Sequence, residues 1–323
     1  MSKPSLALQE YSFEISSSQV NGPLNLNETV LSAQTSEPEW QRETEGFTDI
    51  EELGEIPVKY TLKQSGDSDR FEIEARAVSS RPDSHSSAEL ESHLHKVLGL
   101  RDDLLSFYWA FEGDEPLAST FSLLRGLRLM RGTNLFESLI CSILSQNNSA
   151  LLWNRTARLM MKLYGRRVDF PDGSTSNLFP NPQALAKVSA RELQSKTSMG
   201  YRAKPVVQVS RMVTSGEFRL DEVATSGYDE AMEMLLELPG VGPKVADCFL
   251  LYGAGKLEAA PVDVWIHRIV TRLYFRGRRV SRLKTAGFLR ERFGGWAGYA
   301  QLYLFDYVRR TAQARGKSNK SPP

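Results

Sequence analysis

The sequence predicts an α+β fold in which a small antiparallel β-rich N-terminal domain precedes an all-α body of two lobes. Apolar and polar side chains alternate along parts of the first 78 residues, which is typical of strands with one face on a core. From residue 89 onward the apolar residues recur at helical spacing instead. We therefore expect a β-rich domain with its linker over residues 1–88, a helical body over 89–316 and a flexible tail over 317–323.

The strands are predicted where apolar residues occupy every second position, because successive side chains of a strand point to opposite faces. The two clearest runs are Val58, Tyr60, Leu62 and Phe71, Ile73, Ala75. The segment that follows, residues 78–89, is rich in Ser and contains Pro82, which is the composition of a linker.

The helices are predicted from apolar residues three and four positions apart, which share one face of a helix. Two such sets are Leu135, Leu139, Ile140, Ile143 and Ala231, Met234, Leu235, Leu238. Between them, residues 170–182 are rich in Gly, Pro, Ser and Asn, and we expect an exposed connection there.

Composition excludes several classes of protein. The chain of 323 residues is 41% hydrophobic and 24% charged, as in an ordinary globular protein. Its two cysteines, Cys141 and Cys248, are too few for a disulfide framework or a four-cysteine iron–sulfur site. His93 and His95 lie in a polar stretch, and we expect them on a solvated surface rather than at a metal. The N-terminus has no apolar core of signal-peptide length, and no apolar run reaches the length of a membrane span, which predicts an intracellular protein.

Charge is distributed unevenly although the net charge is only +1. Residues 1–60 carry 11 acidic and 3 basic side chains, whereas residues 264–323 carry 14 Lys or Arg against Glu291 and Asp306. A basic region on a near-neutral protein indicates a face for a polyanion, and a merely solvated surface is the alternative.

The segment LLELPGVGPKVADCFLLY is the most informative part of the chain. An amphipathic helix ends at Leu238 and a second begins at Pro243, since proline is favoured in a first helical turn. Between them, Gly240 and Gly242 permit positive φ and the close approach of another backbone. The free N–H groups of these glycines and Val241 would bind an anion such as a DNA phosphate, whatever the DNA sequence. A purely structural corner between two helices is the alternative.

This run and the segment APVDVWIHR at residues 260–268 resemble the helix-hairpin-helix (HhH-GPD) DNA glycosylase superfamily, whose signature is a hairpin, a Gly/Pro-rich loop and an aspartate. The resemblance covers roughly residues 115–310. Through GVGPKVADC and PVDV it points to the branch of 8-oxoguanine DNA glycosylase/AP lyases. It implies a bifunctional enzyme of base excision repair that excises flipped-out 8-oxoguanine opposite cytosine.

Lys244 and Asp263 are the catalytic residues that the resemblance implies. Lys244 lies in the first turn of the second helix, where the helix dipole and burial would disfavour its ammonium form. The neutral amine could then form a Schiff base with the sugar, and β-elimination would follow. Asp263 is predicted to cap the helix that follows it. Its carboxylate would also stabilise positive charge on the sugar and accept a proton from the amine.

The resemblance further implies a pocket for the flipped-out base. Gln301 would bind the Watson–Crick edge of the base and Phe305 would stack on its face. Cys248 would line the same pocket, and the backbone carbonyl of Ala33 would contact the N7–H of the oxidised base. From the residues alone, Phe305 and Cys248 could equally be core residues and Gln301 a surface residue.

Two polar loops resemble DNA-contacting loops of the same branch. In SQNNS (145–149), Gln146, Asn147 and Asn148 match the positions that fill the vacated stack. In GYRAK (200–204), Tyr201 and Arg202 match residues that wedge the duplex and bind the opposite cytosine.

Three positions depart from the pattern of that branch. Leu151 stands where the family often has a second cytosine-reading arginine, with Arg155 as the nearest basic alternative. Trp265 replaces a histidine two residues after the aspartate, and Ala33 replaces a glycine. We therefore expect weaker discrimination of the opposite base than the branch norm, with the chemistry unchanged.

Two other functions remain open. An alkylated-base DNA glycosylase has the same fold but typically lacks the lysine, and a noncatalytic helix-hairpin-helix DNA-binding protein would leave the pairing of Lys244 with Asp263 unexplained. We expect no metal site and no required cofactor, with a monovalent cation at the hairpin left open. The expected partner is double-stranded DNA containing a damaged base, bound by a monomer that does not contact a membrane. The protein should then lie with the DNA, in the cytoplasm or nucleoid, or in the nucleus of a eukaryote.

Overall fold

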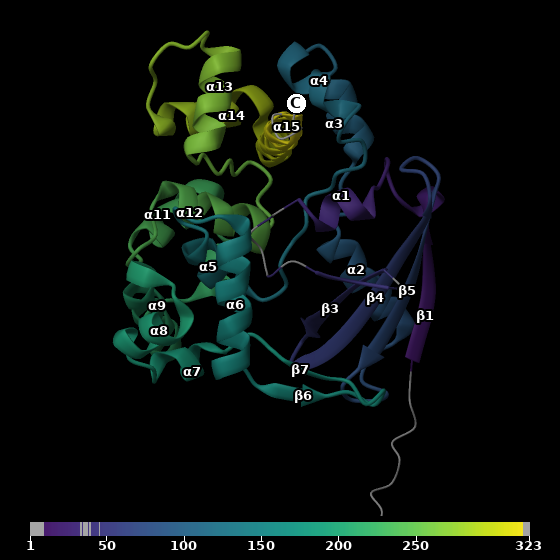
Figure 1. Ribbon diagram of the computed structural model, residues 1–323, viewed down its shortest axis with the longest axis vertical. Helices are drawn as coiled ribbons and strands as arrows, with labels where there is room; N and C mark the ends of the chain where they lie inside the picture. The colour runs from purple at the N-terminus through teal and green to yellow at the C-terminus, as the bar shows by residue number, and fades with distance from the viewer. Residues whose placement is uncertain (1–9, 33, 35–37, 39, 45, 319–323) are drawn as a thin grey trace, which may run out of the picture.

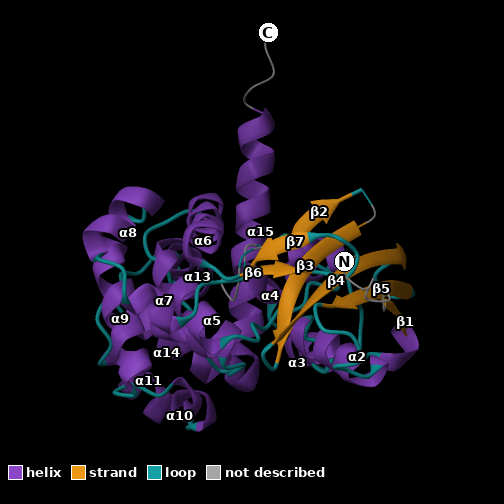
Figure 2. Ribbon diagram, turned by 90° about the horizontal axis from the view of Figure 1, so that it is seen from below, coloured by secondary structure: helices purple, strands orange, loops and turns teal. Residues whose placement is uncertain are grey.

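The computed structural model describes residues 10–32, 34, 38, 40–44 and 46–318. The strands gather on one side of the molecule and most helices on the other (Figures 1 and 2). The predicted α+β fold, with the β-rich part first, is therefore confirmed. None of the helices within these stretches has the length and apolarity needed to cross a bilayer.

The N-terminal part is built on a five-stranded antiparallel sheet with strand order β1-β5-β4-β3-β2. Both predicted runs lie in it, and Val58, Tyr60 and Leu62 of β4 point to the same buried side as the alternating apolar residues of β5. The strands are β1 (Glu10–Ser16), β2 (Gln41–Glu43), β3 (Gly46–Leu53), β4 (Ile56–Gly66) and β5 (Phe71–Ser79).

Helix α2 (Ser87–Val97) follows the polar segment after β5 and shares a hydrophobic core with the sheet. It begins with a capping box in which Ser86 and Glu89 bind each other's backbone N–H groups. The expectation that His93 is solvated is wrong, because His93 lies on the buried face of this helix and stacks on the Tyr60 ring. Helix α2 thus belongs to the core of the sheet. The domain boundary at residue 88 stays a prediction.

The expectation of an exposed connection at residues 170–182 is wrong in part: residues 171–177 are exposed or half-buried, but Phe170 and residues 178–180 are buried. Strands β6 (Arg167–Asp169) and β7 (Thr175–Asn177) form a hairpin there. Phe170, at the start of the turn, and Leu178, directly after β7, are buried in a small cluster with Val78 of the sheet. The polar composition belongs to the turn, while the apolar residues that flank it attach the hairpin to the sheet.

The rest of the chain is helical, and one hydrophobic core runs through it. In Figure 1, α13 to α15 lie with α3 and α4 in one group, and α5 to α12 lie in a second group beside the sheet. The helices are α1 (Leu26–Val30), α3 (Leu104–Phe111), α4 (Glu115–Phe121), α5 (Leu135–Leu144), α6 (Ala150–Tyr164), α7 (Pro182–Ala186), α8 (Ala190–Thr197), α9 (Ala203–Ser215), α10 (Leu220–Thr225), α11 (Tyr228–Leu236), α12 (Pro243–Cys248), α13 (Val264–Tyr274), α14 (Arg282–Phe293) and α15 (Ala297–Ser318), with short 3-10 turns at Ser17–Gln19, Gly200–Arg202 and Gly294–Trp296.

The long helix α15 contacts the N-terminal part directly. Arg309 donates a hydrogen bond to the Leu31 carbonyl oxygen at 2.9 Å, and Arg310 forms an ion pair with Glu28. Both arginines also bind Asp306, one helical turn earlier. These contacts hold the segment after α1 against the face of α15 that carries Gln301 and Phe305.

Candidate active site

The hairpin of residues 238–242 joins α11 to α12 as a tight turn. Gly240 has a φ of +79°, and a Cβ there would lie 2.5 Å from the Pro205 Cβ, so only glycine fits. Gly242 does not use the freedom that was expected of it, because its backbone is extended and it serves as the N-cap of α12. The N–H groups of both glycines donate to no described residue and are free for a ligand, whereas the Val241 N–H donates to Leu238.

Lys244 occupies the second position of α12, where the hairpin fixes the start of the helix. Its half-buried side chain reaches across to α5, and Nζ donates a 2.8 Å hydrogen bond to the Ser145 Oγ. Ser145 is buried at the end of α5 and donates its own proton to the Ser142 carbonyl oxygen. The amine is therefore held at the mouth of a cavity by a group from a different helix.

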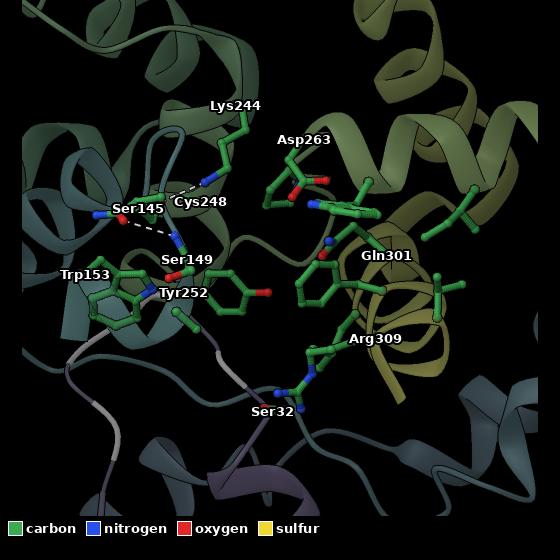
Figure 3. Close-up of a pocket in the computed structure, with 18 residues that line it drawn as sticks. Ser32, Ser145, Ser149, Trp153, Lys244, Cys248, Tyr252, Asp263, Gln301 and Arg309 are labelled. Atoms are coloured by element: carbon green, nitrogen blue, oxygen red, sulfur yellow. Dashed lines mark hydrogen bonds between the residues drawn. The ribbon is translucent and has the colours of Figure 1, made fainter. Parts of the chain in front are cut away.

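Asp263 is the N-cap of α13, as predicted, and its Oδ1 accepts the Ile266 N–H at 2.8 Å. The side chain is half-buried and faces the same cavity as Lys244 (Figure 3). No hydrogen bond or ion pair joins these two described side chains. A fixed carboxylate and an amine thus face one cavity from separate helices, with room between them for a reacting group.

That cavity has a volume of about 360 Å³ and lies between α5, α6 and α12 on one side and α13 and α15 on the other. Most of the sequence-predicted pocket residues line it: Lys244, Asp263, Gln301, Phe305 and Cys248. Ala33 lies outside the described residues, but its neighbour Ser32 is part of the wall. The lining is mainly apolar with a few polar groups, which suits a flat heterocyclic ligand.

Gln301 and Phe305 lie one helical turn apart on α15 and both face the cavity. Gln301 is only 6% exposed, and its Oε1 is buried without a hydrogen-bond partner among the described residues. A buried amide oxygen without a partner is costly, so this atom is placed to receive a donor from a ligand. Cys248 is buried one turn after Lys244, which fits its expected position in the wall.

Several further residues of the wall were not predicted from the sequence, among them Ser145, Trp153, Tyr252 and Arg309. Two of them could have been predicted from the sequence, because Ser145 is the first residue of the SQNNS loop and Tyr252 follows Lys244 at helical spacing. Tyr252 lies in a π-helical turn, Phe249–Gly253, that continues α12. Arg309 lies on α15 one turn after Phe305 and lines the same cavity.

The two polar loops lie next to each other beside the hairpin. Gln146 Nε2 donates to the Gly240 carbonyl oxygen at 3.4 Å, and Asn147 Nδ2 donates to the Tyr201 hydroxyl at 3.3 Å. Asn148 lines the cavity and donates to the Leu144 carbonyl oxygen. Tyr201 is 56% exposed, which its predicted contact with a duplex requires.

Arg202 differs from Tyr201 in that its guanidinium is buried. It donates to the carbonyl oxygens of Gln146, Asn147 and Met199 and lies over the Tyr201 ring. In this structure Arg202 therefore connects the two loops to each other. Its predicted contact with an opposite base would require some of these hydrogen bonds to be exchanged.

A second, shallower cavity of about 710 Å³ continues from the first across the mouth of the site. Its walls are the SQNNS loop, the start of α12 and the N-terminal turn of α14, including Arg282. Further basic residues on α13, on α14 and in the loop between them are exposed, among them Arg268, Arg272, Arg278, Arg279 and Lys284. A groove with a basic edge fits a polyanion that passes over the pocket.

Asp247 supports the floor of this groove from inside α12. Burial raises the pKa of its carboxyl to about 6, although the Tyr228 hydroxyl and the Arg290 guanidinium favour the charged form. The Tyr228 hydroxyl donates to Asp247 at 2.7 Å and accepts from Arg290 at 3.0 Å. This chain of contacts links α11, α12 and α14 and fixes the helix that carries Lys244.

Within the described part of the chain, no group of three or more His, Cys, Asp or Glu side chains is placed to hold a metal ion. The groups present in the cavity can attack, accept protons and bind hydrogen-bonding edges. They suit covalent and acid–base chemistry on an organic ligand.

Residues 140–294 match the family described as HhH-GPD superfamily base excision DNA repair protein. A probable N-glycosylase/DNA lyase of Methanothermobacter thermautotrophicus (strain Delta H) is 34% identical over 310 residues, which are 90% of this chain and 95% of the relative. The chain belongs to the HhH-GPD superfamily. Its hairpin, Lys244 and Asp263 all lie within the matched residues.

Two solved structures extend the similarity to the whole fold. A structure of MBOgg1 in complex with a low-affinity DNA ligand has a TM-score of 0.79 at 26% identity and covers 95% of this chain and 100% of that one. The 8-oxoguanine glycosylase/lyase of Clostridium acetobutylicum, in complex with DNA, has a TM-score of 0.79 at 23% identity and covers 96% and 100%. The N-terminal sheet is therefore part of the architecture that these HhH-GPD proteins share.

Proposed function

We propose that the chain is a bifunctional DNA glycosylase/AP lyase of base excision repair that removes a flipped-out oxidised purine, 8-oxoguanine opposite cytosine. The observation that carries the proposal is the meeting of Lys244 and Asp263 at one cavity whose far wall holds Gln301 and Phe305. The relative that is 34% identical, a probable N-glycosylase/DNA lyase, supports the same pair of activities.

The reaction begins with attack by the Lys244 Nζ on C1′ of the nucleotide. The bond between C1′ and the base breaks, and the base leaves with the electron pair and takes up the proton that Asp263 receives from the amine. Positive charge develops on the sugar during this step, and the Asp263 carboxylate stabilises it and accepts a proton from the amine. Because Asp263 is fixed as the N-cap of α13, its position costs little reorganisation during the reaction.

The lyase step uses the covalent bond that the first step leaves. The sugar ring opens as O4′ takes up a proton from water, which leaves a protonated imine on Lys244. This electron sink acidifies the C2′ proton. Loss of that proton expels the 3′ phosphate by β-elimination and cuts the strand. Hydrolysis of the imine then frees the enzyme, and no metal or organic cofactor takes part. A monovalent cation at the hairpin stays a prediction.

The base has to leave the duplex to reach this cavity. A flipped purine would stack on Phe305, and the unpartnered Gln301 Oε1 would accept a hydrogen bond from its edge. Tyr201 and the SQNNS loop would occupy the space that the base leaves in the stack. The free N–H groups of Gly240 and Gly242 would bind a backbone phosphate of double-stranded DNA, with the enzyme acting as a monomer.

An alkylated-base glycosylase of the same fold is the competing enzyme. Lys244 disfavours it, since a monofunctional glycosylase activates water and needs no amine at the cavity. A noncatalytic DNA-binding protein is disfavoured by the cavity itself, which a hairpin that only binds phosphate does not require.

The proposal is tested by single-turnover excision from duplexes that carry 8-oxoguanine opposite each of the four bases, an alkylated purine or an oxidised pyrimidine. We expect fastest excision of 8-oxoguanine opposite cytosine, together with strand cleavage at the same site. Faster excision of the alkylated purine would identify the competing enzyme instead.

A further inference from the structure

Tyr252 contributes a hydroxyl group to the base cavity that has no partner among the described residues. Its ring is only 5% exposed and lies in the π-helical turn Phe249–Gly253, two turns after Lys244. In Figure 3 the ring extends from the wall formed by that turn, and its hydroxyl points toward the middle of the pocket. Gln301 lies on the opposite side.

The other buried tyrosines of the described chain behave differently. The hydroxyl of each forms a hydrogen bond with a protein group: Tyr60 with the Leu90 carbonyl oxygen, Tyr299 with Asp102, Tyr303 with the Leu127 carbonyl oxygen, and Tyr108 with Tyr303 and the Gly126 N–H. Buried tyrosine hydroxyls ordinarily find such partners. The Tyr252 hydroxyl differs from these because it faces the cavity and is available to a ligand bound there.

The hydroxyl keeps its proton under all ordinary conditions. Burial raises the pKa of Tyr252 well above its usual value, and the nearby Cys248 and the carboxylates of Asp263 and Asp306 raise it further. The group is thus a neutral phenol that can donate one hydrogen bond. On the other wall, the Gln301 Oε1 offers an acceptor, so the two walls present complementary polar atoms to one ligand.

We infer that the Tyr252 hydroxyl donates a hydrogen bond to an exocyclic carbonyl oxygen of the flipped base and so favours bases that carry an oxo group at that position. The inference rests on the proposed function, since it needs a base in this cavity. It makes Tyr252 a specificity-determining residue whose ring also forms part of the wall. A base with an amino group or a methyl group at that position would leave the hydroxyl unpaired, and its excision would be slower.

The test separates binding of the base from chemistry on the sugar. Tyr252→Phe removes the hydroxyl and keeps the ring, and it breaks no hydrogen bond to a described residue. We expect single-turnover excision of 8-oxoguanine to fall about 10- to 100-fold. Strand cleavage at a preformed abasic site, where no base enters the pocket, should stay within about twofold of the wild type.

Tyr303→Phe is the matched control, because Tyr303 lies on α15 with its hydroxyl bonded in the core rather than in the cavity. It should lower the melting temperature without changing the ratio of base excision to abasic-site cleavage. Equal losses of both activities in Tyr252→Phe would overturn the inference, as would undiminished excision. If the wild type cleaves abasic sites but excises no 8-oxoguanine, the proposed substrate fails, and this outcome is distinct from a failure of Tyr252.

Discussion

Asp263 caps α13 and, in the proposed function, also acts in catalysis, so replacing it should change stability and catalysis independently. Its Oδ1 caps α13 through a 2.8 Å hydrogen bond from the Ile266 N–H. Asp263→Ala removes the cap, which costs about 1 kcal/mol and lowers the melting temperature of a chain of this length by about 1–2 °C. Asp263→Asn keeps an acceptor oxygen at the same position, so its melting temperature should stay close to that of the wild type.

Catalysis should respond differently, because neither variant carries a negative charge. Loss of a preorganised electrostatic group costs about 10²–10³ in rate, so single-turnover excision should fall at least 100-fold in both. Asp103 provides the matched control: it caps α3 through the Ser106 N–H at 3.1 Å and does not line the cavity. Asp103→Ala should lose similar stability and retain excision. If excision followed melting temperature across all these variants, Asp263 would be a cap and nothing more.

Three further substitutions test how the site is supported. Ser145→Ala removes the acceptor of the 2.8 Å hydrogen bond from the Lys244 Nζ, so borohydride trapping should slow about 10-fold with duplex affinity unchanged. An unchanged trapping rate would contradict the role of Ser145 in holding the amine. Leu151→Arg places a hydrogen-bond donor at a position where the side chain is 79% exposed. The preference for cytosine as the opposite base in single-turnover excision should rise about 10-fold. Equal rates opposite all four bases would refute this expectation. Burial raises the pKa of Asp247 from 3.8 to about 6, so its stabilising contribution is present below pH 4 and is lost as the pH rises through 6. Asp247→Asn should therefore gain about 2–3 kcal/mol of unfolding free energy relative to the wild type between pH 4 and 7 in denaturant titrations, and a pH-independent difference would contradict the assignment.

The parts of the fold that could be predicted are those with a local cause. The alternation of apolar and polar residues predicted β4 and β5, because a strand with one buried face requires it. The hairpin glycines and Pro243 predicted the start of α12. Asp263 was recognisable as an N-cap because capping depends on the adjacent residues alone. Features with such local causes can be predicted from a single sequence.

The parts that were missed depend on contacts between distant segments. His93 is buried because α2 packs on the sheet, and the hairpin of β6 and β7 forms because Phe170 and Leu178 find a cluster there. Arg309 belongs to the cavity because the Leu31 carbonyl oxygen binds it from the N-terminal part. The sequence around Arg202 gives no sign that its guanidinium is buried between two loops.

The central claim is that the Lys244 amine attacks the sugar, and borohydride trapping on a duplex with 8-oxoguanine opposite cytosine tests it most directly. The wild type should form a covalent protein–DNA complex, and Lys244→Gln should form none while binding the duplex with unchanged affinity. Lys256→Gln is the control, since that lysine donates to the backbone carbonyl oxygens of Ala224 and Ser226 and does not line the cavity; it should trap normally. Undiminished trapping by Lys244→Gln would contradict the account.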